Sequence, residues 1–246
     1  MTGATSVSNG GGSRRAAASH TGGEAGSATD LPTAETILAA VDLLSHYWSR
    51  PVADEVERWA EARELEAETH RLISSEPARS PARVPEGAEE TLGLLEEYER
   101  LFVGPGQVPC PPYESFWRED VPVDIRRTLM GPCTAELKTI YRELGLQVSA
   151  GSCELPDHVA IELEALAYAL SLEGAEPVAR RLFEEHLGQF LPRLCRAVTH
   201  DAAVAFYRDL AALTLDWLAA IKAYFGCCRL DLMRALEAAE ARPGGA

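Results

Sequence analysis

Residues 202–225 read AAVAFYRDLAALTLDWLAAIKAYF, and this stretch carries the strongest helical periodicity in the sequence. Its large apolar side chains recur at steps of three or four residues, namely Phe206, Leu210, Leu213, Trp217, Ile221 and Tyr224. That spacing places them on one face of an α-helix. Because an apolar helix face must be buried against other elements, the stretch predicts a core of helices packed around it.

The same helical period continues over most of the remaining chain. It predicts a helix from Leu31 to about Arg50, with Thr33 as its N-cap. Further helices are expected over about 52–73, 88–102, 123–144 with an interruption at Gly131-Pro132, from Pro156 onward, 177–187, 190–200 and 228–240. No segment has the apolar–polar alternation of a half-buried strand. We therefore predict an all-α fold, a single globular domain of about eight or nine helices.

Composition divides the chain into a tail and one domain. Residues 1–30 are dominated by Gly, Ser, Ala and Thr, and such a stretch cannot bury enough apolar area to offset its ordering entropy. We predict a disordered tail over 1–30 and a helical domain over 31–246. Within the domain, three prolines predict a linker at 74–87, and five prolines without a helical period predict a long loop at 104–122.

The charge balance restricts the partners that the protein can bind. Asp and Glu number 38 against 23 Lys and Arg, so the formal net charge is −15. Clustered cations are needed to bind nucleic acid or anionic lipid, and we therefore expect neither partner. The negative charge serves either solubility or a partner that carries positive charge.

Three features of the sequence indicate a cytoplasmic protein. The chain has no run of the roughly 18 apolar residues that a membrane span needs. Arg14 and Arg15 are followed by small and polar residues instead of an apolar stretch, so we do not expect them to form an export signal. The cysteines form no C-x-x-C pair, and this spacing indicates reduced thiols.

The first of two motifs begins at Tyr98 with YERLFVGPG and continues from Pro109 with PCPPYESFW. The Gly-Pro-Gly sequence ends a helix sharply, and the prolines after it hold the loop in an extended form. Tyr113, Phe116 and Trp117 follow on that loop. They predict either a binding wall for an apolar peptide or a plug for one end of the bundle core.

The second motif is ELPDHVAIELE at residues 154–164. Asp157 and His158 are expected in the first turn of a helix, where the helix dipole stabilises Asp157, and Glu162 follows His158 by one turn. His158 can act as a metal ligand, a proton carrier or a hydrogen-bonding strut, and we expect a strut. Phosphate-loop, dinucleotide-binding and zinc-protease motifs are absent from the sequence. We therefore expect no catalytic residue, no cofactor and no bound metal.

Together the two motifs resemble the TorD/DmsD/NarJ family of redox-enzyme maturation chaperones. The resemblance rests on Tyr-x-x-Leu-Phe-x-Gly-Pro-Gly, Pro-Pro-Tyr-Glu-Ser and Pro-Asp-His-x-x-x-Glu-Leu-Glu, and it covers about residues 31–240. It implies a cytoplasmic all-α protein without catalysis, which binds the twin-arginine leader of a molybdopterin oxidoreductase subunit and delays export until the cofactor is inserted. The leader-binding positions that it implies here are Leu101, Pro112, Tyr113, Asp157 and His158.

The chemistry of such a leader, two adjacent arginines followed by an apolar stretch, adds further candidates. Candidates to line an apolar groove are Leu101, Tyr113, Phe116 and Trp117. Candidates to bind the guanidinium groups are the carboxylates of Glu114, Asp157 and Glu162. We expect His158 to position Asp157. The expected partners are the leader and the apo form of the catalytic subunit, and the chaperone itself is expected to be a monomer or a swapped dimer.

Two alternatives stay open at this point. In the first, the chain is an enzyme or a metal-binding helical protein that uses Asp157, His158 and Glu162. In the second, it is an adaptor that binds only the folded client through its acidic surface. Metal analysis distinguishes the first alternative from a chaperone, and the affinity for a client without its leader distinguishes the second.

Overall fold

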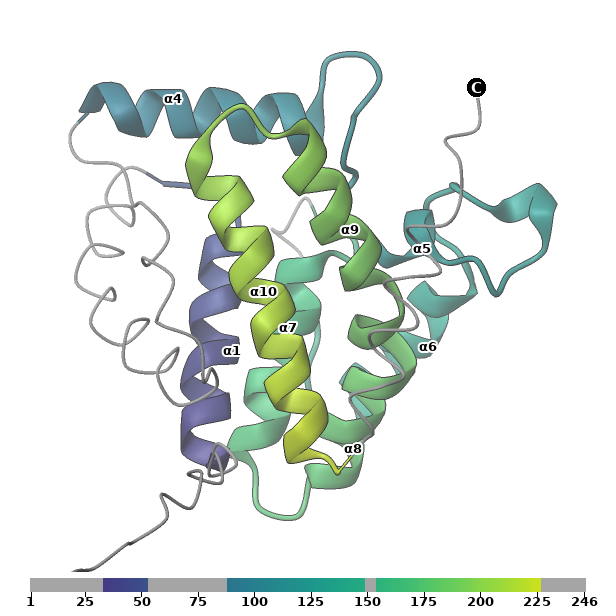
Figure 1. The fold of residues 1–246 in the computed structure, drawn as a ribbon. Coiled ribbons are helices and arrows are strands. Elements are labelled where there is room, and N and C mark those ends of the chain that lie inside the picture. Colours follow the sequence, from purple (N-terminus) through teal and green to yellow (C-terminus); the bar gives the residue numbers. More distant parts are fainter. Residues whose placement is uncertain (1–32, 53–87, 149–153, 227–246) are drawn as a thin grey trace, which may run out of the picture.

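The computed structural model describes residues 33–52, 88–148 and 154–226, and Figure 1 shows their arrangement. Every regular element in these ranges is helical, and the β pairing that they contain is an isolated bridge. The all-α fold predicted from the sequence is therefore confirmed for the described residues. Outside these ranges lie the expected tail over 1–30, the linker over 74–87, most of the helix over 52–73 and the helix over 228–240.

Helix α10, Ala205–Tyr224, is present where its periodicity predicts it. It packs against α9, Gly188–Asp201, and against α1, Ala34–Trp48, which in turn packs along α7, Val159–Ser171 (Figure 1). Its predicted apolar face is buried except for the half-buried Tyr224. Although α10 has 20 residues, none of the helices in the described ranges combines the length and apolar character that crossing a membrane requires.

Both ends of α1 are fixed by side-chain hydrogen bonds. Thr33 is the N-cap, as predicted, and its Oγ1 accepts a hydrogen bond from Thr36 N at 3.2 Å. At the other end, Trp48 Nε1 donates to Thr214 Oγ1 on α10 at 3.0 Å. Because both groups are buried, this bond satisfies two polar atoms that would otherwise destabilise the core.

One continuous helical run stands where the sequence predicts separate helices over 177–187 and 190–200. It consists of α8, Glu176–Arg181; the π-helical segment η3, Leu182–Leu187; and α9. Gly188 permits the wide turn, because a Cβ atom there would lie only 2.9 Å from the Phe183 carbonyl oxygen. Pro192 therefore lies inside the helical run.

Helix α4, Ala88–Tyr98, lies across the end of the bundle where α9 passes into α10 (Figure 1). The Glu97 carboxylate fixes this contact, since its Oε1 accepts hydrogen bonds from Ala203 N at 2.5 Å and Val204 N at 3.3 Å. The Arg100 guanidinium donates two more bonds to Glu97, at 2.7 and 2.8 Å. Burial favours the protonated acid, yet these hydrogen bonds hold the pKa of Glu97 below its usual range.

The proline-rich stretch 104–122 is not wholly irregular, although its composition predicts a loop without structure. It contains a short helix, α5, Glu114–Trp117, which packs against α6, Pro132–Glu143, and against α9. A helix of four residues is too short to show a hydrophobic period in the sequence. The prolines therefore position a helical turn against the bundle.

The prediction of a helix from Val123 up to Gly131 is wrong. Only a 3₁₀ turn over Val123–Ile125 is present before α6 begins at Pro132. Arg127 and Met130 have φ values of 57° and 62°, and this left-handed conformation cannot continue a right-handed helix. The segment between α5 and α6 is thus a turn that brings α6 back beside α5.

We predict that Trp217→Ala lowers the free energy of unfolding by about 3–5 kcal/mol, because it removes a large buried aromatic side chain from the centre of α10. Urea denaturation measures the loss. Tyr168→Ala is the matched control, since Tyr168 is an exposed aromatic residue on α7. A Trp217→Ala variant that unfolds with the same midpoint as the control would contradict the contribution of Trp217 to the core.

Candidate functional site

The two sequence motifs meet at the N-terminal ends of α5 and α7. Backbone hydrogen bonds join 112–114 to 157–159, from Glu114 N to the Asp157 carbonyl at 2.9 Å and from Val159 N to the Pro112 carbonyl at 2.9 Å. Tyr113 and His158 consequently form an antiparallel β-bridge, and their rings pack edge to face with centroids 5.3 Å apart. The fold thus makes one site from two segments that are distant in the sequence.

Asp157 and His158 each cap a helix, and they cap different helices. Asp157 Oδ2 accepts a hydrogen bond from Ser115 N at 3.2 Å, in the first turn of α5. His158 is the N-cap of α7, and its Nδ1 accepts from Ala160 N at 3.2 Å. The sequence predicts both residues in the first turn of a helix, and this prediction is wrong because α7 begins only at Val159. The expected contact in which His158 positions Asp157 is not among the hydrogen bonds of these two residues.

His158 is held as a neutral imidazole. Burial lowers the pKa of His158 below its usual value, although the carboxylates of Glu154 and Asp157 favour the charged form. Its Nε2 is buried without a hydrogen-bond partner and lies 3.9 Å from Glu154 Oε2, beyond hydrogen-bonding distance. The side chain of His158 therefore caps α7 within its own motif and contacts the first motif through its ring, which packs against Tyr113.

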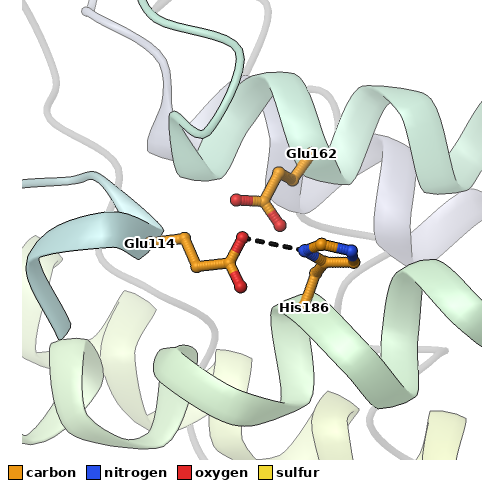
Figure 2. Close-up of side chains that lie close together, drawn as sticks. All are labelled: Glu114, Glu162 and His186. Atoms are coloured by element: carbon orange, nitrogen blue, oxygen red, sulfur yellow. Dashed lines mark hydrogen bonds and ion pairs between the residues drawn. The ribbon is translucent and has the colours of Figure 1, made fainter. Parts of the chain in front are cut away.

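The carboxylates of Glu114 and Glu162 lie in the protein interior. Glu114 Oε1 accepts a hydrogen bond from Arg118 at 2.6 Å, and Glu114 Oε2 lies 2.9 Å from His186 Nδ1. Glu162 extends from α7 toward the same place (Figure 2), and its oxygens have no hydrogen-bond partner. Burial, reinforced by Glu114 and Asp157, raises the pKa of Glu162 well above its usual range.

All three carboxylates proposed from the sequence to bind arginines of a peptide are closed to solvent. Glu114, Asp157 and Glu162 each have 0 % of their surface exposed. In this conformation a peptide on the surface does not reach them. Their positions instead indicate a structural centre behind the two motifs.

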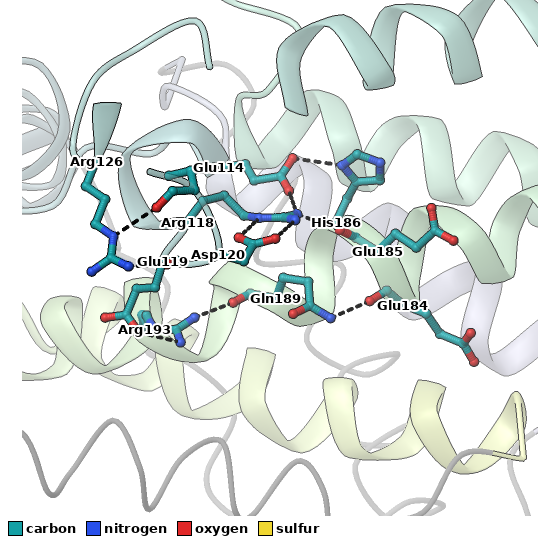
Figure 3. A network of polar contacts seen from close by, with 11 residues as sticks. Glu114, Arg118, Glu119, Asp120, Arg126, Glu184, Glu185, His186, Gln189 and Arg193 are labelled. Atoms are coloured by element: carbon teal, nitrogen blue, oxygen red, sulfur yellow. Dashed lines mark hydrogen bonds and ion pairs between the residues drawn. The ribbon is translucent and has the colours of Figure 1, made fainter. Parts of the chain in front are cut away.

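Arg118 occupies the side of this centre that faces the loop (Figure 3). Its guanidinium donates to Glu114, to the Glu185 carbonyl at 2.6 Å and to Asp120. Two further contacts brace the same loop, from Arg193 to Glu119 at 3.0 Å and from Arg126 to the Glu119 carbonyl at 2.7 Å. An arginine of this chain therefore already binds the carboxylate that the sequence assigns to an arginine of a partner.

The apolar candidates divide into buried and accessible residues. Leu101 and Pro112 are buried, so they support the loop from behind. Tyr113, Phe116 and Trp117 are each half-buried and present part of their rings to solvent. The Trp117 indole donates to a carbonyl of the preceding proline pair at 2.6 Å, which fixes the ring. These three aromatic residues form the accessible apolar surface of the site.

Two partly exposed carboxylates belong to the motifs, Glu99 to the first and Glu154 to the second, and Glu154 contacts Tyr113. Glu154 Oε2 accepts a hydrogen bond from the Tyr113 hydroxyl at 2.6 Å, and the Glu154 side chain is 34 % exposed. Glu99 is 35 % exposed and accepts from Arg50 Nε at 2.8 Å. Burial raises the pKa of Tyr98, and the negative charges of Glu154 and Glu99 raise it further. The site therefore has an acidic rim next to its aromatic surface.

Sequence reasoning missed several members of the site. Arg118 follows Glu114 by four residues, and the spacing of an ion pair on one helical face could have identified it. Glu154 lies at the start of the second motif, but the sequence offers no separate reason to assign it a binding role. His186 has no signal in the sequence, because only the packing of η3 against α6 and α7 brings it to Glu114.

Comparisons with known proteins give a consistent result. Residues 54–196 match the family model described as nitrate reductase delta subunit. The Tat proofreading chaperone DmsD of Salmonella typhi is 33% identical over 130 residues, which are 51% of this chain and 61% of that protein. The DmsD of Salmonella paratyphi A is 31% identical over 146 residues, which are 58% of this chain and 69% of that protein.

The chain thus spans 61% of the length of the first of these relatives. A crystal structure described as that of a redox enzyme maturation protein from Archaeoglobus fulgidus aligns with a TM-score of 0.46 and 22% identity. This alignment covers 72% of this chain and 90% of that chain.

We predict that His158 makes the fold sensitive to acid. Because its pKa is lowered in the folded state, the unfolded chain binds a proton below about pH 6.5 that the folded chain does not bind. Stability should therefore fall as the pH drops below that value. His158→Asn keeps a capping side chain and removes the titration, so this variant should lose less stability than the native chain between about pH 7 and about pH 5.

Urea denaturation at several pH values measures this difference. His46→Asn is the control, since His46 is an exposed histidine on α1 and its variant should follow the native chain. Parallel pH profiles for His158→Asn and the native chain would show that His158 does not titrate between the folded and unfolded states as the burial indicates.

Proposed function

Because this chain belongs to the nitrate reductase delta subunit family, we propose that it is a cytoplasmic chaperone, not an enzyme, for the assembly of a molybdopterin-containing oxidoreductase. It binds the twin-arginine signal peptide of the catalytic subunit and delays export until the cofactor is inserted. The names of the DmsD relatives, Tat proofreading chaperones, support this role. Residues 31–246 form the chaperone domain in this proposal.

The observation that carries the proposal is the Tyr113–His158 bridge. It joins the two motifs and leaves the rings of Tyr113, Phe116 and Trp117 half-exposed on a rigid support. Fixed aromatic rings bind an apolar peptide segment at a low entropic cost, because little of their own freedom remains to be lost. We assign the apolar part of the leader to this surface.

We assign the arginines of the leader to Glu154 and Glu99 in place of the buried Glu114, Asp157 and Glu162. The two rim carboxylates are partly exposed and lie beside the aromatic surface. Arg50 on Glu99 illustrates how a guanidinium binds at this rim. Charge-assisted contacts of this kind contribute about 1.5–3 kcal/mol each when they are partly buried.

Isothermal titration calorimetry with a twin-arginine leader peptide of a molybdoenzyme tests the proposal. We expect a dissociation constant of about 1 µM, near −8 kcal/mol, because a chaperone must also release its client. The same leader with two lysines in place of the arginines should bind about ten-fold more weakly, since lysine cannot form the bidentate contact. Equal affinity for both peptides, or no binding to any leader, would contradict the leader site.

Variants of the surface residues test the assignment within the site. We predict that Tyr113→Ala and Glu154→Gln each weaken leader binding about ten-fold, or about 1.4 kcal/mol, with little change in the melting temperature. Glu173→Gln is the matched control, because Glu173 is an exposed carboxylate beyond the far end of α7. A lowered melting temperature with unchanged affinity would show that Tyr113 only plugs the end of the core.

The catalytic subunit itself supplies a second test. In the proposal the chaperone also contacts the apo form of that subunit, so a client without its leader should bind, but more weakly than the full-length client. Equal affinity for both forms would favour an adaptor that binds only the folded client. Size-exclusion chromatography with light scattering in the same experiment distinguishes a monomer from a swapped dimer.

A further inference from the structure

We propose that Glu114, Glu162 and His186 form a binding site for a divalent transition-metal ion of the zinc or manganese kind. The three residues stand on three separate elements, α5, α7 and η3. One ligand atom of each lies within 4.8 Å of the others, and Figure 2 shows the two carboxylates and the imidazole turned toward a common centre. The proposal does not depend on leader binding.

The state of Glu162 points to a missing partner. Glu162 is fully buried, and both of its carboxylate oxygens lack a hydrogen-bond partner. Buried carboxylates in proteins are hydrogen-bonded, paired with a cation or bound to a metal. The Glu162 oxygens instead face Glu114 and His186 (Figure 2). A metal ion at the common centre supplies the partner that the rest of the interior does not.

The charges around the centre match a dication. Glu114, Glu162 and Asp157 supply three buried carboxylates, and Asp157 acts electrostatically on Glu162. Arg118 supplies one guanidinium, bound to Glu114 at 2.6 Å. Two negative charges are then left unmatched when the carboxylates are ionised. A single divalent ion neutralises them without a change in the fold.

The donor atoms suit ions of the zinc or manganese kind. Carboxylate oxygens combined with a neutral imidazole bind Zn²⁺, Mn²⁺ and related ions, whereas thiolates are the softer alternative. Bonds of about 2.0–2.1 Å to a tetrahedral ion keep ligand atoms roughly 3.3 Å apart. Glu114 Oε2 and His186 Nδ1, at 2.9 Å, need only a small outward adjustment. Arg118 holds Glu114 in place from outside, as partners of metal ligands commonly do.

A surface cavity adjoins the centre at His186. It has a volume of about 260 Å³, and its wall includes His186 together with three acidic residues, Glu136, Glu143 and Glu185. These carboxylates are exposed, although Glu143 also pairs with Arg181. An acidic mouth raises the local concentration of cations. His186 therefore links the buried centre to the surface.

Metal analysis of the full chain provides the test. Protein treated with a chelator and then titrated with zinc chloride or manganese chloride alone should bind about one equivalent and melt at a higher temperature. Glu162→Gln and His186→Gln should each weaken that binding at least about ten-fold. The controls Glu164→Gln and His200→Gln change exposed residues of the same types and should bind like the native chain.

Two outcomes would overturn the proposal. The first is no binding of either ion by the native chain, together with a metal-free Glu162→Gln variant that is more stable than the native chain, which would show that Glu162 is simply protonated. The second is unchanged binding in both variants. X-ray absorption on the zinc-loaded native chain keeps the test decisive if a variant does not fold. A zinc coordination shell of nitrogen and oxygen atoms supports the site, whereas sulfur ligands would place the ion on cysteines.

Discussion

Two backbone hydrogen bonds, from Glu114 N to the Asp157 carbonyl and from Val159 N to the Pro112 carbonyl, hold the proline-rich loop against the start of α7. Proline has no backbone N–H, so a loop rich in proline has few donors for internal backbone pairing. Its position therefore depends on this junction. The carboxylate of Asp157 adds a cap to α5, and the loop gains a helical turn only because another segment caps it.

The junction also explains why so much charge is buried behind it. Once α5 is fixed, Glu114 points inward toward His186, and Arg118 follows one turn later to meet it. Removing one partner from such a buried group destabilises a protein by several kcal/mol, since the other charge is left alone. The centre therefore makes the geometry of the loop specific, because a shifted loop would separate the charges from their partners.

The parts of the fold that depend on residues close together in the sequence were predictable. The face of α10, the N-cap Thr33 and the end of the helix before Gly104 all follow from residues close together in the sequence. The features that the sequence did not predict depend on packing between distant segments. They are the π-turn at Gly188, the helical turn at Glu114 and the contact of His186 with Glu114. Local rules assign Asp157 to the nearest helix, whereas the folded chain uses it for α5.

Glu162 and Glu164 show this limit most directly. They are two residues apart on one helix and look alike in the sequence, yet one is fully buried and the other is exposed. A helical pattern indicates which face is apolar, but it does not show that a carboxylate on that face has been enclosed by α5 and η3. The same limit explains why the sequence assigns guanidinium binding to three carboxylates that the folded chain buries.

The net charge of −15 thus belongs to two populations of acidic residues with different physical effects. Exposed carboxylates act on a partner only within a Debye length of about 8 Å at physiological salt. Glu154 has that reach at the aromatic surface, because it is partly exposed and accepts a hydrogen bond from the Tyr113 hydroxyl. Buried carboxylates are hardly screened, and they act on each other and on Arg118. In the proposed complex a peptide therefore meets a rim whose electrostatic attraction weakens as salt increases, on a support whose internal ion pairs are hardly screened. Affinity for a cationic segment should then depend on the rim, while the shape presented to its apolar segment depends on the buried centre.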